Sequence, residues 1–235
     1  MTENKNLKVV VNNPFETFYA CRRKVFIPNY YLIRPIGNAP PELLVSKYDR
    51  VHDEIAVIQR TYQDTDIAIP KLEEIKVNYA KLPRKYGGPL VLATYKAVIM
   101  LPYQVSIMKM MENFRYGVAM IVPSERLFLE LLEDKNYSFT ERNLVDVHDG
   151  IIKYVEFYHE DFKDLFVYFD KWEDLPKIIK KTNFKKVKER GKKFISEYEK
   201  YALDLWAQVL DIIPTKDLIK EEQPMCGNSE FYNYE

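Results

Sequence analysis

The chain has few cysteines, no net charge and no long apolar run, and each absence argues against a class of protein. Its 235 residues include two cysteines, Cys21 and Cys226, whose wide spacing argues against a disulfide framework, so we expect free thiols in a reducing compartment. Its 35 Lys and Arg residues balance 35 Asp and Glu residues, so we expect no nucleic-acid partner. No apolar run reaches the ~20 residues of a membrane helix, and the first residues are polar. We therefore expect a cytoplasmic protein without a signal peptide or transmembrane segment.

Well-marked catalytic motifs are also missing. The chain contains no G-x-S-x-G, Walker A, H-E-x-x-H or C-x-x-C motif, which argues against the hydrolases, nucleoside triphosphatases, zincins and thiol oxidoreductases that carry them. The three histidines, His52, His148 and His159, lack the spacing of metal ligands. We assign them no catalytic role.

The most informative stretch is residues 92–132, where two strands alternate with two helices. Residues 95–101 and 118–122 are apolar runs of strand length, and a proline follows each of them. Residues 107–114 carry apolar side chains at the i, i+3, i+4, i+7 spacing of a buried helical face. Two apolar strands joined by a helix predict a βαβ crossover in a parallel sheet.

Small polar residues and a glycine mark the ends of these helices. Ser106 and Ser124 are expected to be N-caps, because a hydroxyl accepts hydrogen bonds from first-turn amides, and Gly117 is expected to end the first helix. The amides at the start of that helix form an anion-binding end, so we expect a phosphate over residues 105–107. The opposite, solvent-facing side of the helix is expected to carry Lys109, Glu112 and Asn113.

The rest of the chain extends this α/β pattern. The sequence predicts strands at residues 7–11 and 30–36, helices at 15–23, 51–62 and 71–79, and a long amphipathic helix over 184–213 interrupted at Gly191. We expect one α/β domain over residues 1–215, a Rossmann-like parallel sheet flanked by helices with a long C-terminal helix. Residues 216–235 are expected to form a polar, flexible tail.

Two further places suit a ligand. Arg34 and Gly37 lie at the carboxyl end of the strand at 30–36, which is where open α/β sheets bind ligands. Gly87 and Gly88 form a loop in which the backbone has room to approach a phosphate closely. Arg34 is the cation that we consider first for such a group.

Residues 102–124, PYQVSIMKMMENFRYGVAMIVPS, resemble the donor-binding segment in the C-terminal domain of GT-B glycosyltransferases. They are more closely similar to glycosyltransferase-like proteins of large algal viruses and protists with a PYQVS…E…PS pattern. The resemblance implies that Glu112 holds the ribose of a nucleotide sugar. Gln104 stands eight residues earlier, where many members of the family have a second glutamate, and Ala119 replaces a usual proline.

The resemblance implies a nucleotide-sugar-binding half-domain of a GT-B enzyme. Its activity would be transfer of a hexose or pentose from a nucleotide diphosphate sugar to a glycan or glycoprotein acceptor, with no cofactor required. A second domain or chain, or the aromatic segment 137–169, would supply the acceptor site. No catalytic residue is assigned. The expected donor-binding residues are Arg34, Gly37, Tyr103, Gln104, Ser106, Glu112 and Ser124.

Two alternatives come from other classes. Asp64 and Asp66 form a D-x-D triplet with Thr65, the pattern with which GT-A glycosyltransferases hold Mn²⁺ or Mg²⁺ against the donor diphosphate. The chain could instead be a non-catalytic interaction module. Nucleotide-sugar binding, with and without a divalent metal, separates the three possibilities.

Overall fold

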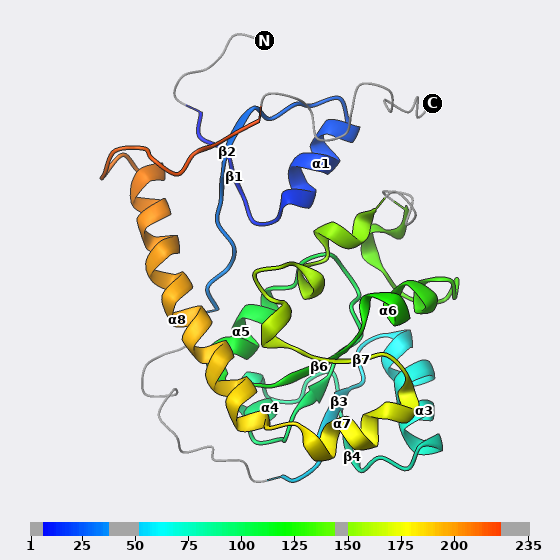
Figure 1. The fold of residues 1–235 in the computed structure, drawn as a ribbon. Helices are drawn as coiled ribbons and strands as arrows, with labels where there is room; N and C mark the ends of the chain where they lie inside the picture. The colour runs from blue at the N-terminus through cyan, green and yellow to red at the C-terminus, as the bar shows by residue number, and fades with distance from the viewer. Residues whose placement is uncertain (1–6, 38–51, 144–149, 222–235) are drawn as a thin grey trace. The chain divides into compact units, whose positions relative to one another are not determined.

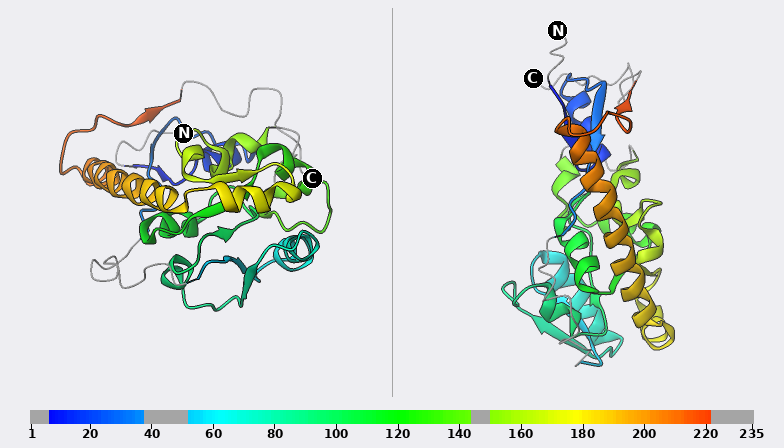
Figure 2. Two further views of the ribbon diagram at one scale, coloured as in Figure 1. Left: turned by 60° about the horizontal axis from the view of Figure 1, so that its bottom comes forward. Right: turned by 90° about the vertical axis from the view of Figure 1, so that its left-hand side faces the viewer.

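A computed structural model describes residues 7–37, 52–143 and 150–221 of the chain (Figure 1). These residues belong to two compact units. The first unit consists of residues 1–36 and 197–235, and the second of residues 37–196. Helix α8 (Phe184–Val209) begins in the second unit and ends in the first, and both views in Figure 2 show it as one continuous helix. The interruption that the sequence predicts at Gly191 is therefore wrong.

The first unit contains a three-stranded sheet in the order β1-β2-β8. Strands β1 (Val10–Val11) and β2 (Asn29–Leu32) run parallel and are joined by helix α1 (Pro14–Arg22). Asn13 caps α1, since its side-chain oxygen accepts from the Phe15 amide at 2.7 Å. Strands 7–11 and 30–36 are thus confirmed in shorter form, and so is the helix between them.

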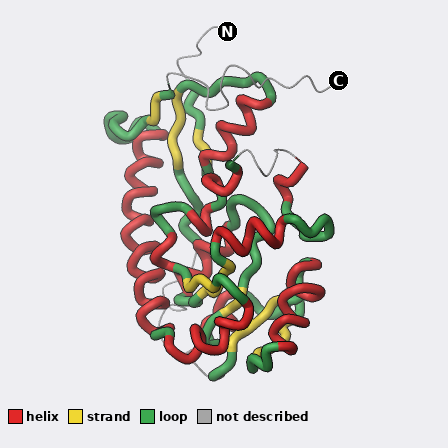
Figure 3. Tube along the Cα trace, turned by 45° about the vertical axis from the view of Figure 1, so that its right-hand side comes forward, coloured by secondary structure: helices red, strands yellow, loops and turns green. Residues whose placement is uncertain are grey.

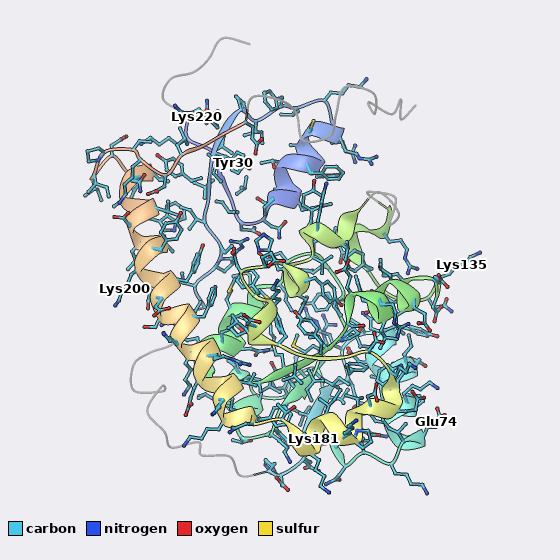
Figure 4. All side chains as sticks on the ribbon, in the orientation of Figure 1. Tyr30, Glu74, Lys135, Lys181, Lys200 and Lys220 are labelled. Atoms are coloured by element: carbon cyan, nitrogen blue, oxygen red, sulfur yellow. The ribbon has the colours of Figure 1, made fainter. Side chains whose placement is uncertain are left out.

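The second half of α8 packs against this sheet through a small apolar core. Its buried members are Tyr31, Ile33, Ala202 and Leu205. Strand β8 (Ile219–Lys220) pairs antiparallel with β2, and Figure 4 labels Tyr30 and Lys220 on these two strands. The predicted tail therefore contains a strand, and its residues 222–235 lie outside the described residues.

One expectation about the first unit is wrong. Cys21, which is buried on α1, is disulfide-bonded rather than a free thiol. Wide spacing in the sequence does not measure distance in a fold, so the spacing argument fails for this residue. Cys226 lies outside the described residues.

The second unit contains a five-stranded, all-parallel sheet in the order β4-β3-β5-β6-β7. The strands are β3 (Ile55–Ile58), β4 (Tyr79–Leu82), β5 (Val98–Ile99), β6 (Met120–Pro123) and β7 (Val167–Phe169). Figure 3 shows them as short yellow segments with helices around them. The predicted α/β class, with a parallel sheet flanked by helices and a long C-terminal helix, is confirmed.

The connections of this sheet are mostly short helices. They are a π-helix (Gln63–Ala68) followed by α3 (Ile69–Glu74), then α4 (Pro89–Ala93), α5 (Met108–Tyr116), α6 (Glu125–Leu132) and α7 (Leu175–Lys181). Between α6 and β7 the described chain forms 3₁₀ turns at Thr140–Asn143, Ile151–Tyr154, Glu156–Tyr158 and Lys163–Leu165, and another, Trp172–Asp174, precedes α7. The βαβ crossover β5-α5-β6 confirms the central prediction from residues 92–132.

The helix predicted at 51–62 is wrong, because its centre forms β3. Ile55, Ala56 and Val57 are completely buried, so this run packs on both faces of the sheet as a central parallel strand does. The helical spacing of Ile55, Ile58 and Tyr62 favoured a helix, but burial on both faces of the sheet decides the structure of this run. The helix predicted at 71–79 begins two residues earlier and ends at Glu74, before β4.

Asn113 also differs from its expected place. It is completely buried on α5, where its Nδ2 lies 3.5 Å from the Met100 sulfur and 3.3 Å from the Met120 sulfur. Phe114 follows it and packs against Gly191 of α8, where an added Cβ would lie 3.0 Å from the Phe114 ring. Gly191 therefore lets α8 approach α5 closely, which explains a glycine inside a continuous helix.

Candidate functional site

The strand order of the second unit points to one place on the sheet. Taken along the chain, the strands are arranged second, first, third, fourth, fifth, so the order reverses between β3 and β5. In open α/β sheets, ligands bind outside the carboxyl ends of the strands at this switch point. The loops that meet there follow β3, β4 and β5, and they comprise residues 59–62, 83–88 and 100–107.

Arg60 and Tyr103 face each other across the switch point. The Arg60 guanidinium lies 4.5 Å from the centre of the Tyr103 ring, a cation–π contact between the β3 and β5 loops. Asp64 shapes the first loop, since its Oδ2 accepts from the Arg60 amide at 3.2 Å and the Thr61 amide at 2.9 Å. Burial raises the pKa of the Tyr103 hydroxyl, and Arg60 opposes that shift. Tyr103 is therefore a neutral hydrogen-bonding group beside an exposed cation.

Lys109 adds a second cation from the first turn of α5. Its Nζ lies 4.7 Å from the centre of the Tyr86 ring and 4.0 Å from Oε2 of Glu112. Burial lowers the pKa of Lys109, Arg60 lowers it further, and Glu112 acts in the opposite direction. The side chain of Glu112 is 39% exposed, so its carboxylate remains accessible beside the ammonium group.

The loop after β4 contains two glycines whose backbone is accessible. Gly87 and Gly88 have φ angles of +96° and +90°, which favour glycine. A Cβ added to Gly88 would meet no atom within 4 Å, so space lies next to this backbone. The predicted Gly-Gly loop therefore lies at the carboxyl end of β4, next to the β3 loop that carries Arg60.

Gly37, the first residue of the second unit, contacts helix α5. Its φ is +59°, and an added Cβ would lie 2.8 Å from the Glu112 amide nitrogen and from the Met111 carbonyl. Arg115 Nε donates to the Gly37 carbonyl at 3.1 Å. Two predicted site residues, Gly37 and Glu112, are thus brought together. Arg34 belongs to the first unit, where it is buried and its amide donates to Tyr198 Oη at 2.7 Å.

The β5 and β6 ends of the sheet edge are covered by the chain itself. We call residues 137–143 and 150–158 the covering segment. Within it, Tyr137 Oη donates to the Pro102 carbonyl at 2.8 Å, and the Thr140 amide donates to the Tyr103 carbonyl at 2.9 Å. Tyr158 Oη donates to the Pro123 carbonyl at 3.1 Å. These residues belong to the aromatic segment 137–169, which we considered as an acceptor site. Their hydrogen bonds hold the loops after β5 and β6 in place.

Two buried carboxylates of the covering segment hold the turn before α5. Glu141 Oε2 accepts from the Val105 amide at 3.1 Å, and Glu156 Oε2 accepts from the Ser106 hydroxyl at 2.7 Å. Glu141 is 8% exposed and Glu156 is 1% exposed. The Val105 amide, which we expected to help bind a phosphate, is therefore already bonded to a carboxylate.

Ser106 is not the N-cap that the sequence predicts. Helix α5 begins at Met108, its N-cap is Ile107, and no side chain caps it. The hydroxyl of Ser106 instead donates to Glu156, because the covering segment offers a buried carboxylate that local sequence does not show. Gln104 Nε2 donates to the Ser106 carbonyl within the same turn. Both side chains remain partly exposed.

Ser124 is the N-cap of α6, as predicted, with its Oγ accepting from the Leu127 amide at 3.2 Å. The same hydroxyl donates to Asp170 Oδ1 at 2.6 Å, and Arg126 Nε reaches that oxygen at 2.9 Å. These contacts join the end of β6 to the residue after β7. Ser124 therefore has a structural role at the sheet edge.

The D-x-D triplet lies in the π-helix after β3. Oδ2 of Asp64 accepts from the Arg60 amide, the Thr61 amide and the Thr61 hydroxyl, while Asp66 is exposed beside Thr65. Burial is the main cause that raises the pKa of Asp64. Over the described residues, no group of three or more His, Cys, Asp or Glu side chains is placed to hold a metal ion.

Sequence reasoning missed Arg60, Lys109 and Tyr86. A strand prediction over Ile55–Ile58 would have put Arg60 just beyond a carboxyl end, which is the argument that selected Arg34. Lys109 was expected only on the polar face of a helix. Tyr86 carried no signal of its own, because its role comes from a contact between the β4 loop and α5.

A scan against protein-family models, a search of curated proteins and a search of solved structures each find no match for this chain. The functional interpretation therefore rests on the residues described above. Within the described ranges, no helix is long and apolar enough to cross a membrane.

Proposed function

We propose that the second unit binds a nucleotide diphosphate sugar and that the protein acts as a glycosyltransferase or as its donor-binding part. The observation that carries this proposal is the pair of cations at the switch point. Arg60 and Lys109 lie over the rings of Tyr103 and Tyr86, where the sheet order reverses. Cations with polar and aromatic neighbours at this edge suit a phosphate-bearing ligand.

The order of groups along α5 matches the order of groups in such a ligand. Glu112 lies one helical turn after Lys109 on α5, about 5 Å along the helix axis. A carboxylate accepts hydrogen bonds from ribose hydroxyls, and an ammonium group attracts a diphosphate. A nucleotide sugar placed along α5 therefore has its ribose at Glu112 and its diphosphate at Lys109 and Arg60.

The same cations would serve the transfer step. Negative charge builds up on the diphosphate as it leaves the sugar, and fixed positive groups aimed at it stabilise that transition state. Arg60 and Lys109 are the residues that we propose for this role. Transfer also needs a site for the glycan or glycoprotein acceptor, which we propose lies on another domain or chain. No catalytic base is assigned.

Titration calorimetry of the protein against UDP-, GDP- and dTDP-sugars, with EDTA present, tests the proposal. We expect one nucleotide class to bind and Glu112→Gln to weaken that binding by about tenfold, or about 1.4 kcal/mol. Glu133→Gln removes an exposed carboxylate at the end of α6 and is the matched control. Heat from no member of the panel contradicts the proposal and favours an interaction module. Binding that requires Mn²⁺ and is lost in Asp66→Ala favours the GT-A alternative.

A further inference from the structure

We propose that α7 and the first half of α8 form a docking surface for an anionic lipid membrane. Both belong to the second unit. Their exposed basic side chains, which we call the basic surface, are Lys180, Lys181, Lys185, Lys186, Arg190 and Lys192. None of these residues belongs to the candidate site, so the inference stands or falls independently of nucleotide-sugar binding.

The basic surface concentrates positive charge in a chain that is neutral overall. Residues 175–196 contain nine Lys and Arg residues and one acidic residue, Glu189, whereas the whole chain has 35 residues of each sign. Over the ranges that the structure describes, none of the six side chains of the basic surface makes a hydrogen bond or an ion pair. Their charge is therefore directed to the solvent and available to an anionic partner.

The helix that carries most of this surface is fixed to the unit by its other face. Phe184 and Val187 of α8 are buried, at 4% and 5% exposure. Lys188 is used within the fold, because its Nζ donates to the carbonyls of Ala93 at 3.0 Å and Tyr95 at 2.8 Å. The apolar residues and one lysine thus hold the helix in place, and the remaining cations lie along its exposed side.

These cations lie where they oppose helix formation. Lys185 and Lys186 are in the first turn of α8, where the helix dipole favours acidic residues, and this turn contains none. Lys186 and Arg190 are four residues apart, a spacing at which like charges destabilise a helix. A negatively charged partner relieves both unfavourable interactions. A layer of anionic headgroups is such a partner, and polybasic segments are attracted to it.

The side-chain chemistry favours lipid headgroups over nucleic acid. Eight of the nine basic residues in 175–196 are lysines, whose compact charges need no fixed geometry to interact with a layer of headgroups. Binding of single-stranded nucleic acid uses aromatic faces on which bases stack. The two aromatic residues of this segment are turned inward, since Phe184 is buried and the Phe194 ring packs edge-on against Phe114 at 5.9 Å.

The basic surface and the candidate site lie toward opposite ends of the parallel strands. Lys188 contacts the carbonyls of Ala93 and Tyr95, just before β5, and the side chain of Lys192 lies next to Gly117, just before β6. The start of α8 is therefore at the amino ends of these strands, whereas the switch point is at the carboxyl ends. A membrane bound at the basic surface leaves the switch point accessible.

Co-sedimentation of the full chain with lipid vesicles tests the proposal. One set of vesicles is pure phosphatidylcholine, and the other contains equal parts of phosphatidylcholine and phosphatidylserine. At about 0.1 M salt we expect the protein to bind the anionic vesicles at least tenfold more tightly, and we expect this binding to weaken as the salt concentration rises. Equal binding to the two sets, or no binding to either, overturns the inference without any variant.

A triple variant locates the binding. Lys181→Gln, Lys185→Gln and Lys186→Gln together remove half of the charge of the basic surface, and glutamine has nearly the helix propensity of lysine. We expect the affinity for anionic vesicles to fall at least tenfold. Circular dichroism and thermal unfolding check that α8 remains folded.

The matched control removes the same charge from exposed positions elsewhere, with Lys76→Gln, Lys135→Gln and Lys220→Gln in one protein. It should bind anionic vesicles as the wild type does. An equal loss of affinity in the two triple variants would show that the net charge of the chain, rather than the basic surface, attracts the vesicles, and would overturn the inference.

Two competitors separate a membrane from other sources of phosphate. A DNA oligonucleotide and inorganic phosphate are each added to vesicle-bound protein at the phosphate concentration of the lipid. We expect neither to release the protein. Release by DNA favours a nucleic-acid partner and overturns the inference, and release by inorganic phosphate does the same because it indicates a site for a single anion.

Discussion

The two halves of one sheet edge behave differently in this protein. On the β3 and β4 side, the loops present Arg60, Tyr86 and Gly88 with an exposed cation and open backbone. On the β5 and β6 side, Ser106 and Ser124 are bonded to carboxylates of the same chain. Both halves lie at carboxyl ends of parallel strands, so position on the sheet alone does not make a site. What distinguishes them is whether the chain's own side chains already satisfy the polar groups.

The largest effect is expected where the covering segment is anchored. Phe128 of α6 is completely buried, and its ring centre lies 5.6 Å from that of Phe139 and 5.5 Å from that of Tyr158. Phe128→Ala should reduce the free energy of unfolding by about 3–5 kcal/mol, because it leaves a cavity under the segment. Chemical denaturation measures the change. The neighbouring Leu129→Ala, at a 37% exposed position, should change stability by about 0.5 kcal/mol or less. Similar losses in the two variants would show that the segment is not anchored there.

A second effect concerns the open half, where Gly37 packs on α5. Gly37→Ala should destabilise the protein by about 2 kcal/mol, since a left-handed backbone conformation is costly for alanine and its Cβ would press on the backbone at Glu112. It should also weaken nucleotide-sugar binding. Gly150→Ala has a similar left-handed backbone conformation, with φ of +74°, and an open Cβ position, so the difference in denaturation midpoint and affinity isolates the α5 contact. Equal behaviour of the two variants would contradict the role given to Gly37.

A third effect separates binding from stability. Arg60 is exposed, so Arg60→Gln should leave the unfolding temperature unchanged while weakening nucleotide-sugar binding by about tenfold, or about 1.4 kcal/mol. Calorimetry gives the affinity and thermal unfolding gives the stability. Arg190→Gln removes an exposed arginine from α8, outside the switch-point loops, and serves as the matched control. Equal affinity of Arg60→Gln and the wild type would show that Arg60 does not take part in nucleotide-sugar binding.

The smallest effect is a pH dependence on the covered half. Burial raises the pKa of Glu141 above its ordinary value of 4.5, and the bond from Val105 opposes this shift. Between 4.5 and the raised value, the folded state binds more protons than the unfolded state, so this group makes stability fall as pH rises. Glu141→Gln should abolish that contribution. The difference between the thermal unfolding curves of the two proteins, followed from mildly acidic to neutral pH, measures it. A difference that grows in the opposite direction would show that the carboxylate stabilises the turn.

The sequence predicts local features of this fold well and long-range contacts poorly. The β5-α5-β6 crossover, the Ser124 cap and the long α8 helix follow from periodicity and capping signals. The helix expected at 51–62 fails because β3 is specified by burial at the centre of the sheet rather than by spacing. The Ser106 cap fails because Glu156, fifty residues later, takes its hydroxyl.

The candidate site shows the same limit. Glu112 and the Gly87–Gly88 loop could be proposed from the sequence, since a helix carboxylate and a glycine pair are visible locally. Arg60 was missed because Ile55–Ile58 was not predicted as a strand, and the strand order that places β3 beside β5 is not visible in the sequence. The contacts of Glu141 and Glu156 with Val105 and Ser106 could not be predicted either. Both glutamates lie in the connection between α6 and β7, far from Val105 and Ser106 in the sequence.

Hydrogen exchange measured by mass spectrometry, with and without a nucleotide sugar that binds, tests most directly whether the ligand occupies the open half of the sheet edge. We predict new protection in peptides covering residues 59–62, 83–88 and 108–112. We predict no change in peptides from the β6–β7 side, covering residues 124–132 and 158–170. Protection confined to the β6–β7 side would contradict the central claim.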